Sequence, residues 1–284
     1  MKRAHGLPVA LGLAALLVNG CSSLPKKAPN FGQIEPQIGT VTVMPPSFNL
    51  LKVGAFSGQT VSSITHDIEQ EIMWATESII DWSRYSLIKL DASDQALNQD
   101  PKLREAIFAQ NEAAKTAFAA CAKTSGKKID VDYEADIDYF ADLTGSDYFI
   151  FVRGEGFFKT TGAMVKEAAI GAAMAVLFGG FGMGPGSATT LEIIVVDAVR
   201  GKVIWYNVKQ LTEKDPRKPS HLFNSCKAAF EPLLGKIPLK ADKSQDDKII
   251  DKYKNEFGAE ADSTAKGEAH PDIEEEKPAT GGDF

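Results

Sequence analysis

The sequence predicts a single α/β domain in which helices pack on a mixed β-sheet, a three-layer type of architecture. Segments with strand character alternate along the chain with segments of helical periodicity, and turn residues separate them. The chain has 284 residues, of which 44% are hydrophobic and 24% are charged, and this composition is sufficient for one core. We place the domain at residues 38–238.

The first 20 residues have the layout of a secretory signal peptide. Lys2 and Arg3 precede a short apolar stretch, which ends in small residues directly before Cys21. The sequence LVNGC at 17–21 resembles the lipobox of bacterial lipoprotein signal sequences, although its Asn19 is unusual. The resemblance implies cleavage before Cys21 and acylation of that cysteine with chains such as palmitate. It also implies an outer-membrane location, because Ser22 rather than Asp follows; a soluble secreted protein is the alternative.

Residues 21–37 are rich in Pro, Lys and Gly, and we expect them to be a tether between lipid and domain. Loss of residues 1–20 removes two basic residues and no acidic one, which takes the net charge from −7 to −9. A net charge of this sign argues against nucleic acid as a partner and against binding to an anionic membrane surface.

The first half of the domain contains strands and helices in alternation. A short strand at 40–43 is stopped by Pro45 and Pro46. A helix of about six turns follows, with its apolar face at Val61, Ile64, Ile68, Ile72, Ala75 and Ile79. The next elements are a strand at 85–90, a helix at 100–123 that begins with Asp100 and Pro101, a short helix closed by Gly145, and a strand at 146–158.

The second half begins with an apolar, Gly- and Ala-rich insertion at 168–186. A β-hairpin follows at 188–210, in which Gly201 supplies the positive φ of the turn. The last substantial helix covers 219–237, with Ser220 expected as its cap. Residues 239–284 are charged and largely disordered by composition, although the spacing of Ile249, Tyr253 and Phe257 allows a short amphipathic helix.

The insertion is too short and too rich in glycine for a strongly apolar membrane span. Gly171, Ala175 and Gly179 form a stripe of small residues at a spacing of four, which lets another backbone approach closely. We therefore expect a helix that is buried against the domain or against a second subunit. A segment that dips into the membrane or spans it is the alternative.

Besides Cys21, which we expect to be acylated, the mature chain has two cysteines, Cys121 and Cys226. An even number of cysteines in an oxidising compartment favours a disulfide between them. The alternative is two buried free thiols. No further metal-ligand pattern accompanies them, so we predict no metal site.

Other candidate chemistry is not supported by the residue patterns. The glycines at 179–186 end an apolar run rather than open a helix after a strand, which excludes the usual phosphate loop. The acidic stretch 130–138 lacks the Gly and Glu of a calcium loop, so a solvated loop is expected there. His66, His221 and His270 have no partner pattern typical of catalysis. We predict no catalytic residue and no cofactor, with a periplasmic hydrolase as the least favoured function.

Three segments together resemble a family of envelope lipoproteins. They are VTVMPP at 41–46, LTGSDYFIFVRGEG at 143–156 and LEIIVVDAVRGKVIWY at 191–206, with matching residues Gly145, Asp147, Tyr148, Asp197, Gly201 and Trp205. The layout is similar to the α/β domain of the curli secretion lipoprotein CsgG and the N-terminal domain of TolB.

This resemblance implies a non-enzymatic scaffold or accessory module in envelope assembly or secretion, which forms homo-oligomers or binds other envelope proteins. The alternative is a subunit of an oligomeric secretion ring or channel. The chain lacks the paired segments of about ten alternating residues with which the curli channel enters the membrane, which disfavours a pore of that type.

Overall fold

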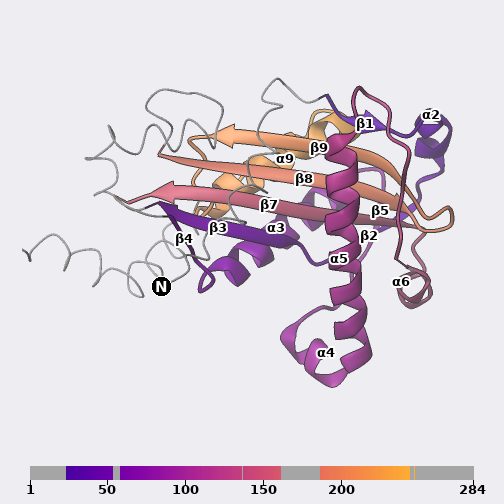
Figure 1. Cartoon of the computed structure of the whole chain (residues 1–284), viewed down its shortest axis with the longest axis horizontal. Coiled ribbons are helices and arrows are strands. Elements are labelled where there is room, and N and C mark those ends of the chain that lie inside the picture. Colours follow the sequence, from indigo (N-terminus) through magenta and orange to yellow (C-terminus); the bar gives the residue numbers. More distant parts are fainter. Residues whose placement is uncertain (1–23, 54–57, 136, 161–185, 244–245, 247–284) are drawn as a thin grey trace, which may run out of the picture.

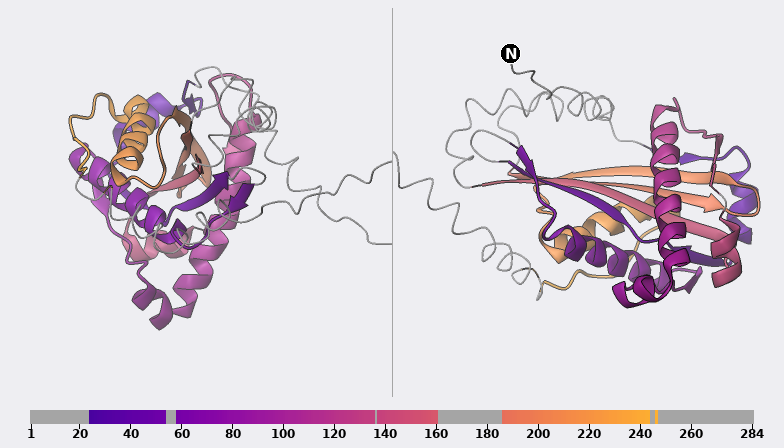
Figure 2. Two further views of the ribbon diagram at one scale, coloured as in Figure 1. Left: turned by 90° about the vertical axis from the view of Figure 1, so that its left-hand side faces the viewer. Right: turned by 60° about the horizontal axis from the view of Figure 1, so that its bottom comes forward.

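A mixed β-sheet forms the centre of the part of the chain that the structure describes, residues 24–53, 58–135, 137–160, 186–243 and 246. The structure is a computed structural model, and Figures 1 and 2 show its sheet with helices on both faces. This architecture confirms the predicted α/β class. The predicted signal peptide (1–20), Cys21 and most of the predicted insertion, with Gly171, Ala175 and Gly179, lie outside the described residues.

Nine strands of the described residues form one sheet, with the order β1-β9-β8-β7-β2-β5 along its main path. Strands β3 and β4 extend the sheet beside β7, and β6 pairs with β9. The strands are β1 (Lys26–Lys27), β2 (Thr40–Val43), β3 (Ser47–Val53), β4 (Gly58–Thr60), β5 (Ser86–Ile88), β6 (Val131–Asp132), β7 (Tyr148–Lys159), β8 (Ser187–Asp197) and β9 (Lys202–Thr212).

Strand β7 is central because it pairs with β8 on one side and with two successive strands on the other. β8 runs antiparallel to β7 from the pair Tyr148–Asp197 to the pair Phe158–Ser187. On the other side, β2 and then β3 run parallel to β7. Pro45 separates β2 from β3, since proline has no N–H to donate to a ladder. The predicted end of the first strand is correct, but β3 was not predicted from the sequence.

Helices cover both faces of the sheet, with α3 and α9 on one face and α5 and α6 on the other (Figures 1 and 2). Neighbouring residues of β7 alternate between the two cores: Ile150 packs with α3 and α9, whereas Phe149 and Phe151 pack with α5. The helices are α2 (Phe31–Ile34), a 3₁₀-helix (Glu35–Gln37), α3 (Thr65–Trp82), α4 (Asp94–Gln99), α5 (Pro101–Lys123), α6 (Asp138–Thr144) and α9 (Pro219–Leu234).

The helix ends follow local capping chemistry. The Asp100 carboxylate accepts hydrogen bonds from the backbone N–H groups of residues 102 and 103, and Pro101 is the first residue of α5, as predicted. Gly145 ends α6 with a φ of 69°. The predicted cap of α9 is wrong, because Ser220 lies inside the helix. Its N–H and hydroxyl instead donate to the carboxylate of Asp246, at 2.8 and 2.6 Å.

The folded part of the chain begins earlier than the predicted boundary at 38. β1 pairs with β9, and the side chains of Phe31 and Ile34 are buried in the core beside α3 and α9. The expected tether at 21–37 is therefore part of the domain from Lys26 onward. The prolines of this stretch indicated a linker. Phe31 and Ile34 nevertheless bury enough apolar surface to hold a short helix against the domain.

The fold also extends past the predicted end at 238. Leu239 and Ala241 pack against the core beside α9, and Asp246 caps that helix. Residues 247–284, which include the possible amphipathic segment, lie outside the described residues. Among the residues that are described, no helix combines the length and apolar character needed to cross a membrane.

The predicted disulfide does not form. Cys121 belongs to the core on the α5 face of the sheet, whereas Cys226 belongs to the core on the α3/α9 face. The sheet lies between them, and a disulfide requires Cα atoms within about 7 Å of each other. Both thiols are free and buried, and burial raises the pKa of each to about 12.

Candidate interaction surface

Helix α3 presents two exposed tryptophans. The side chains of Trp74 and Trp82 are 51% and 41% exposed, whereas the third tryptophan of the chain, Trp205, is fully buried. Large aromatic side chains at a protein surface are typical of binding sites, because burying them on association removes much apolar area from water. The two residues are eight positions apart, about 12 Å along the helix axis.

The two tryptophans belong to a strip of α3 that lies beside the buried stripe of the helix and borders α9 at Trp74. Its residues follow helical spacing, and we call it the α3 strip. The strip consists of Asp67, Glu71, Trp74, Ser78, Asp81 and Trp82. The adjacent stripe of the helix carries Ile68, Ile72 and Ile79, which are buried in the core.

The α3 strip is acidic. Helix α3 contains five carboxylates and neither Lys nor Arg. Burial raises the pKa of Glu71, and the nearby negative charges of Asp67 and Asp246 raise it further. A ligand with positive charge would relieve this repulsion. The strip therefore offers aromatic anchors next to an electrostatic preference for basic groups.

Trp74 is oriented by a neighbour on α9. Its ring lies 5.8 Å from the ring of Phe223, measured between centroids, at an angle of 45°. Phe223 itself is buried. This contact holds one face of the indole against the domain and leaves the remainder exposed, so the side chain is preorganised for a partner.

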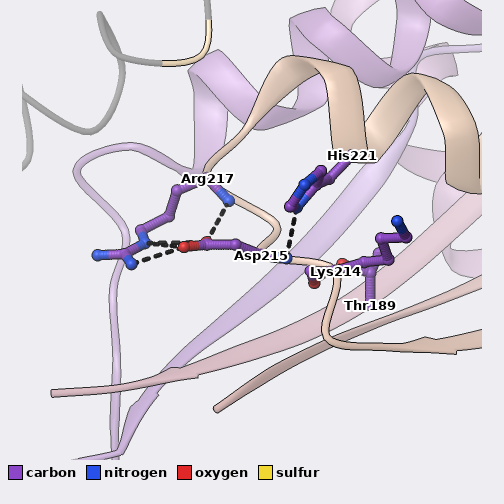
Figure 3. A network of polar contacts seen from close by, with 5 residues as sticks. All are labelled: Thr189, Lys214, Asp215, Arg217 and His221. Atoms are coloured by element: carbon purple, nitrogen blue, oxygen red, sulfur yellow. Dashed lines mark hydrogen bonds and ion pairs between the residues drawn. The ribbon is translucent and has the colours of Figure 1, made fainter. Parts of the chain in front are cut away.

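A polar network occupies the connection between β9 and α9 (Figure 3). The Asp215 carboxylate accepts hydrogen bonds from the backbone and guanidinium of Arg217, at 2.7–2.9 Å. The imidazole Nδ1 of His221 accepts a hydrogen bond from the backbone N–H of Asp215 at 2.9 Å. The hydroxyl of Thr189 donates to the carbonyl of Lys214 at 2.9 Å.

This network holds the backbone of the connection between β9 and α9 in place, and it does not form a catalytic dyad. The carboxylate of Asp215 faces Arg217, whereas the imidazole of His221 faces a backbone amide (Figure 3). Burial lowers the pKa of His221, and the positive charges of Lys214 and Lys218 lower it further. A general base of the serine-hydrolase kind requires the carboxylate to orient the imidazole, which this geometry does not provide.

Buried charges also lie on the α5 face of the sheet. Arg153 donates to Glu192 at 2.7 Å, and the hydroxyl of Tyr206 donates to the other carboxylate oxygen at 3.2 Å. The guanidinium of Arg153 stacks 4.7 Å from the ring centroid of Phe118 on α5. This set compensates the buried charge of Glu192 and the partly buried charge of Arg153, and it connects α5 to the sheet.

The hairpin residues singled out from the sequence lie where β8 turns into β9. Asp197 is fully buried, accepts the backbone N–H of Arg200 at 3.0 Å and pairs with its guanidinium. Gly201 has a φ of 58°, and the ring of Trp205 is buried in the core. These three residues therefore stabilise the turn and the core, and none of them contributes to an exposed surface that binds a partner.

The acidic stretch 130–138 is partly neutralised within the domain. Asp130 and Asp132 both pair with Lys202, at 2.9 and 2.6 Å. Within the described residues no cluster of His, Cys, Asp and Glu has the arrangement of a metal site.

Comparisons with known proteins give remote similarities only. No family model and no curated protein matches the chain. Among solved structures, the chain is similar to lipoprotein GNA1162 from Neisseria meningitidis (8% identity, TM-score 0.29, 62% of this chain and 81% of that one). It is also similar to a PelC dodecamer from Paraburkholderia phytofirmans (11%, 0.34, 76% and 96%) and to the LpoB C-terminal domain from Salmonella enterica (11%, 0.25, 62% and 84%). Such values establish neither a shared family nor a shared function.

Trp74 and Trp82 were not predicted from the sequence as residues of an interaction surface. A signal was present, because both fall outside the apolar stripe of Ile68, Ile72 and Ile79 on the same helix. A tryptophan off the core stripe of an amphipathic helix predicts an exposed aromatic group.

Proposed function

We propose that the protein is an outer-membrane-anchored periplasmic lipoprotein that acts as a non-enzymatic scaffold or accessory module in envelope assembly or secretion. The anchor follows from the lipobox-like sequence at Cys21, and the role follows from the resemblance of the domain to the envelope lipoprotein family. The observation that carries the proposal is the pair of exposed tryptophans, Trp74 and Trp82, on the acidic α3 strip.

The strip favours a particular kind of partner, a protein segment with basic residues on either side of an apolar anchor. The apolar anchor would cover Trp74, which is already held in place by Phe223. The basic residues would lie against Asp67 and Glu71, whose mutual repulsion they would relieve. Aromatic anchors in the centre of an interface contribute most of the binding energy.

The test is site-specific photo-cross-linking in intact cells, with the photoreactive residue at Trp74 or at Trp82. The matched control is Phe108, which is 68% exposed but lies on α5, across the sheet. We expect cross-links from both α3 positions to a basic segment of one other envelope protein, and none from position 108. Glu71→Lys should reduce the yield, because it places a positive charge in the strip.

Truncation after residue 247 separates an external partner from the C-terminal tail and keeps the cap at Asp246. Cross-links that persist in the truncated protein support the proposal. Cross-links only to residues 248–284 would contradict it. Cross-links between two copies of this protein, together with a mass by light scattering that corresponds to a closed ring, would favour the alternative of a ring subunit.

A further inference from the structure

Lys27 is distant in the sequence from Lys127 and Lys128 but lies beside them in the fold. The backbone N–H of Lys27 in β1 donates to the carbonyl of Lys127 at 2.8 Å, and the N–H of Ile129 donates to the carbonyl of Lys27 at 3.0 Å. These bonds hold β1 beside the loop that follows α5. In Figure 1, β1 and the C-terminal end of α5 lie together at one edge of the sheet.

This edge carries exposed positive charge. We call Lys27, Lys123, Lys127 and Lys128 the basic edge; the last three are exposed and Lys27 is partly buried. None of the four forms an ion pair within the part of the chain that the structure describes. The nearest acidic residue in sequence, Asp130, is paired with Lys202.

Lys26 fixes the geometry of the basic edge without contributing to its exposed charge. Its ammonium group donates to the carbonyl oxygens of Cys121 and Thr124, at 2.7 and 2.6 Å, at the C-terminal end of α5. The lysines on α5 and on β1 therefore keep a fixed spacing.

The basic edge lies close to the expected lipid anchor. Cys21 precedes Lys26 by five residues, so the two Cα atoms are at most about 18 Å apart even in a fully extended chain. Strand β7, by comparison, has 12 residues and is about 36 Å long. With so short a connection, acyl chains on Cys21 hold the β1 edge of the domain next to the bilayer.

We infer that the basic edge binds the anionic headgroups of the phospholipid leaflet that carries the anchor, and so fixes the orientation of the domain on the membrane. This inference rests on the lipid anchor of the proposed function. One acyl-linked anchor combined with a basic patch is a known route to stable membrane attachment. The net charge of −9, which argues against binding to an anionic membrane surface, describes the whole chain and not this edge. Charges beyond about one Debye length, about 8 Å at physiological salt, are screened, so the local charge of the basic edge decides its interaction with headgroups.

Helix α3, which carries the α3 strip, packs on the opposite face of the sheet from α5, whose C-terminal end belongs to the basic edge. On its own face, α3 contacts α9 as well as β3, β2 and β5. The basic edge and the α3 strip therefore have no residue and no helix in common. Binding of lipid at the basic edge leaves the α3 strip available to a protein partner.

The test uses the purified lipidated protein in vesicles of phosphatidylcholine, with or without about one third phosphatidylglycerol, and a nitroxide-labelled headgroup as quencher. A fluorophore is attached to Ser125→Cys, in the exposed loop between Lys123 and Lys127. Cys121 and Cys226 are buried and do not compete for the label. The matched control position is Phe108→Cys, 15 residues before the end of α5 and thus about 22 Å away along the helix.

We expect quenching at position 125 that rises with phosphatidylglycerol and falls to the phosphatidylcholine level in 1 M salt, where the Debye length is about 3 Å. Reversal of Lys123, Lys127 and Lys128 to Glu should abolish the rise. The control triple Lys102→Glu, Lys236→Glu and Lys240→Glu changes net charge equally and should retain it. Quenching that is independent of phosphatidylglycerol, or equal loss in both triples, would overturn the inference.

The mass of the same preparation separates this inference from the proposed anchor. An unmodified Cys21 would contradict the lipoprotein proposal itself. If Cys21 is acylated but quenching does not depend on phosphatidylglycerol, only the proposed role of the basic edge is contradicted.

Discussion

Replacement of Gly154 by alanine should destabilise the domain through steric overlap with two core side chains. A Cβ atom at this position in β7 would lie 2.4 and 2.7 Å from two atoms of the Phe48 ring and 2.9 Å from the Leu191 side chain. Carbon atoms do not approach so closely, and Phe48 is itself 7% exposed and packed in the core. The ring or the strand must therefore move.

The expected decrease in the free energy of unfolding is the difference between two opposing effects. Overpacking of a core costs about 1–3 kcal/mol. Replacing glycine by alanine lowers the entropy of the unfolded chain and returns about 0.4–1 kcal/mol. We therefore expect Gly154→Ala to lower the free energy of unfolding by about 1–2 kcal/mol, or the melting temperature by about 2–4 °C per kcal/mol.

Urea denaturation of the wild type and four variants tests this reasoning: Gly154→Ala, Phe48→Leu, the double variant of these two, and Gly39→Ala. Gly39→Ala is the matched control, because a Cβ there meets no atom within 4 Å, and its stability should change by less than about 0.5 kcal/mol beyond the entropic gain. In the double variant with Phe48→Leu, the alanine should cost less than it does alone, by about 1 kcal/mol. Full stability of Gly154→Ala, or strict additivity in the double variant, would refute the steric account.

Three further predictions concern the thiols, the α9 cap and the partly buried His221. Cys121 and Cys226 should resist alkylation in the folded protein and react on unfolding, and a cross-linked peptide in non-reducing mapping would contradict their placement on opposite faces. Asp246→Ala should cost about 1–2 kcal/mol in urea denaturation, because two hydrogen bonds to α9 are lost; an unchanged midpoint would show that the cap contributes little. Folding lowers the pKa of His221 below its ordinary value of 6.5, so stability should fall as the pH drops below 6.5 and the unfolded state takes up the proton. His221→Asn should weaken this pH dependence, and an identical profile would count against the assignment.

Local signals in the sequence predicted several elements correctly. The helix that begins at Pro101 has a capping aspartate, a proline at its first position and an apolar periodicity. All three signals predict a helix that starts at this residue. The β8–β9 hairpin was equally well defined, because Gly201 marks the turn between two runs of β-branched and aromatic residues.

Elements that depend on distant partners were not predictable in this way. β1 has two residues and exists because β9 offers its edge. β3 follows a pair of prolines and is held by β7, more than 100 residues later. The disulfide prediction failed for a related reason, since helical patterns at Cys121 and Cys226 do not reveal which face of the sheet each helix covers.

The candidate interaction surface was only partly predictable from the sequence. The acidic character of α3 was visible, but the contact of Trp74 with Phe223 and the proximity of Asp246 required the packing of α9 against α3. The basic edge combines residues 27 and 123–128, which sequence spacing does not bring together.

The pairing of β1 with β9 has a consequence for the kinetics of folding. The first strand of the domain can complete its hydrogen bonds only after the ninth has been synthesised and placed, and β2 and β3 likewise wait for β7. Such a chain has a high contact order, and loop closure over many residues precedes the gain from pairing. The β8–β9 hairpin is the local unit that can form first, and the N-terminal strands then dock onto a sheet that already exists. Strand β1 is thus expected to order late in folding and, in the reverse direction, to open early.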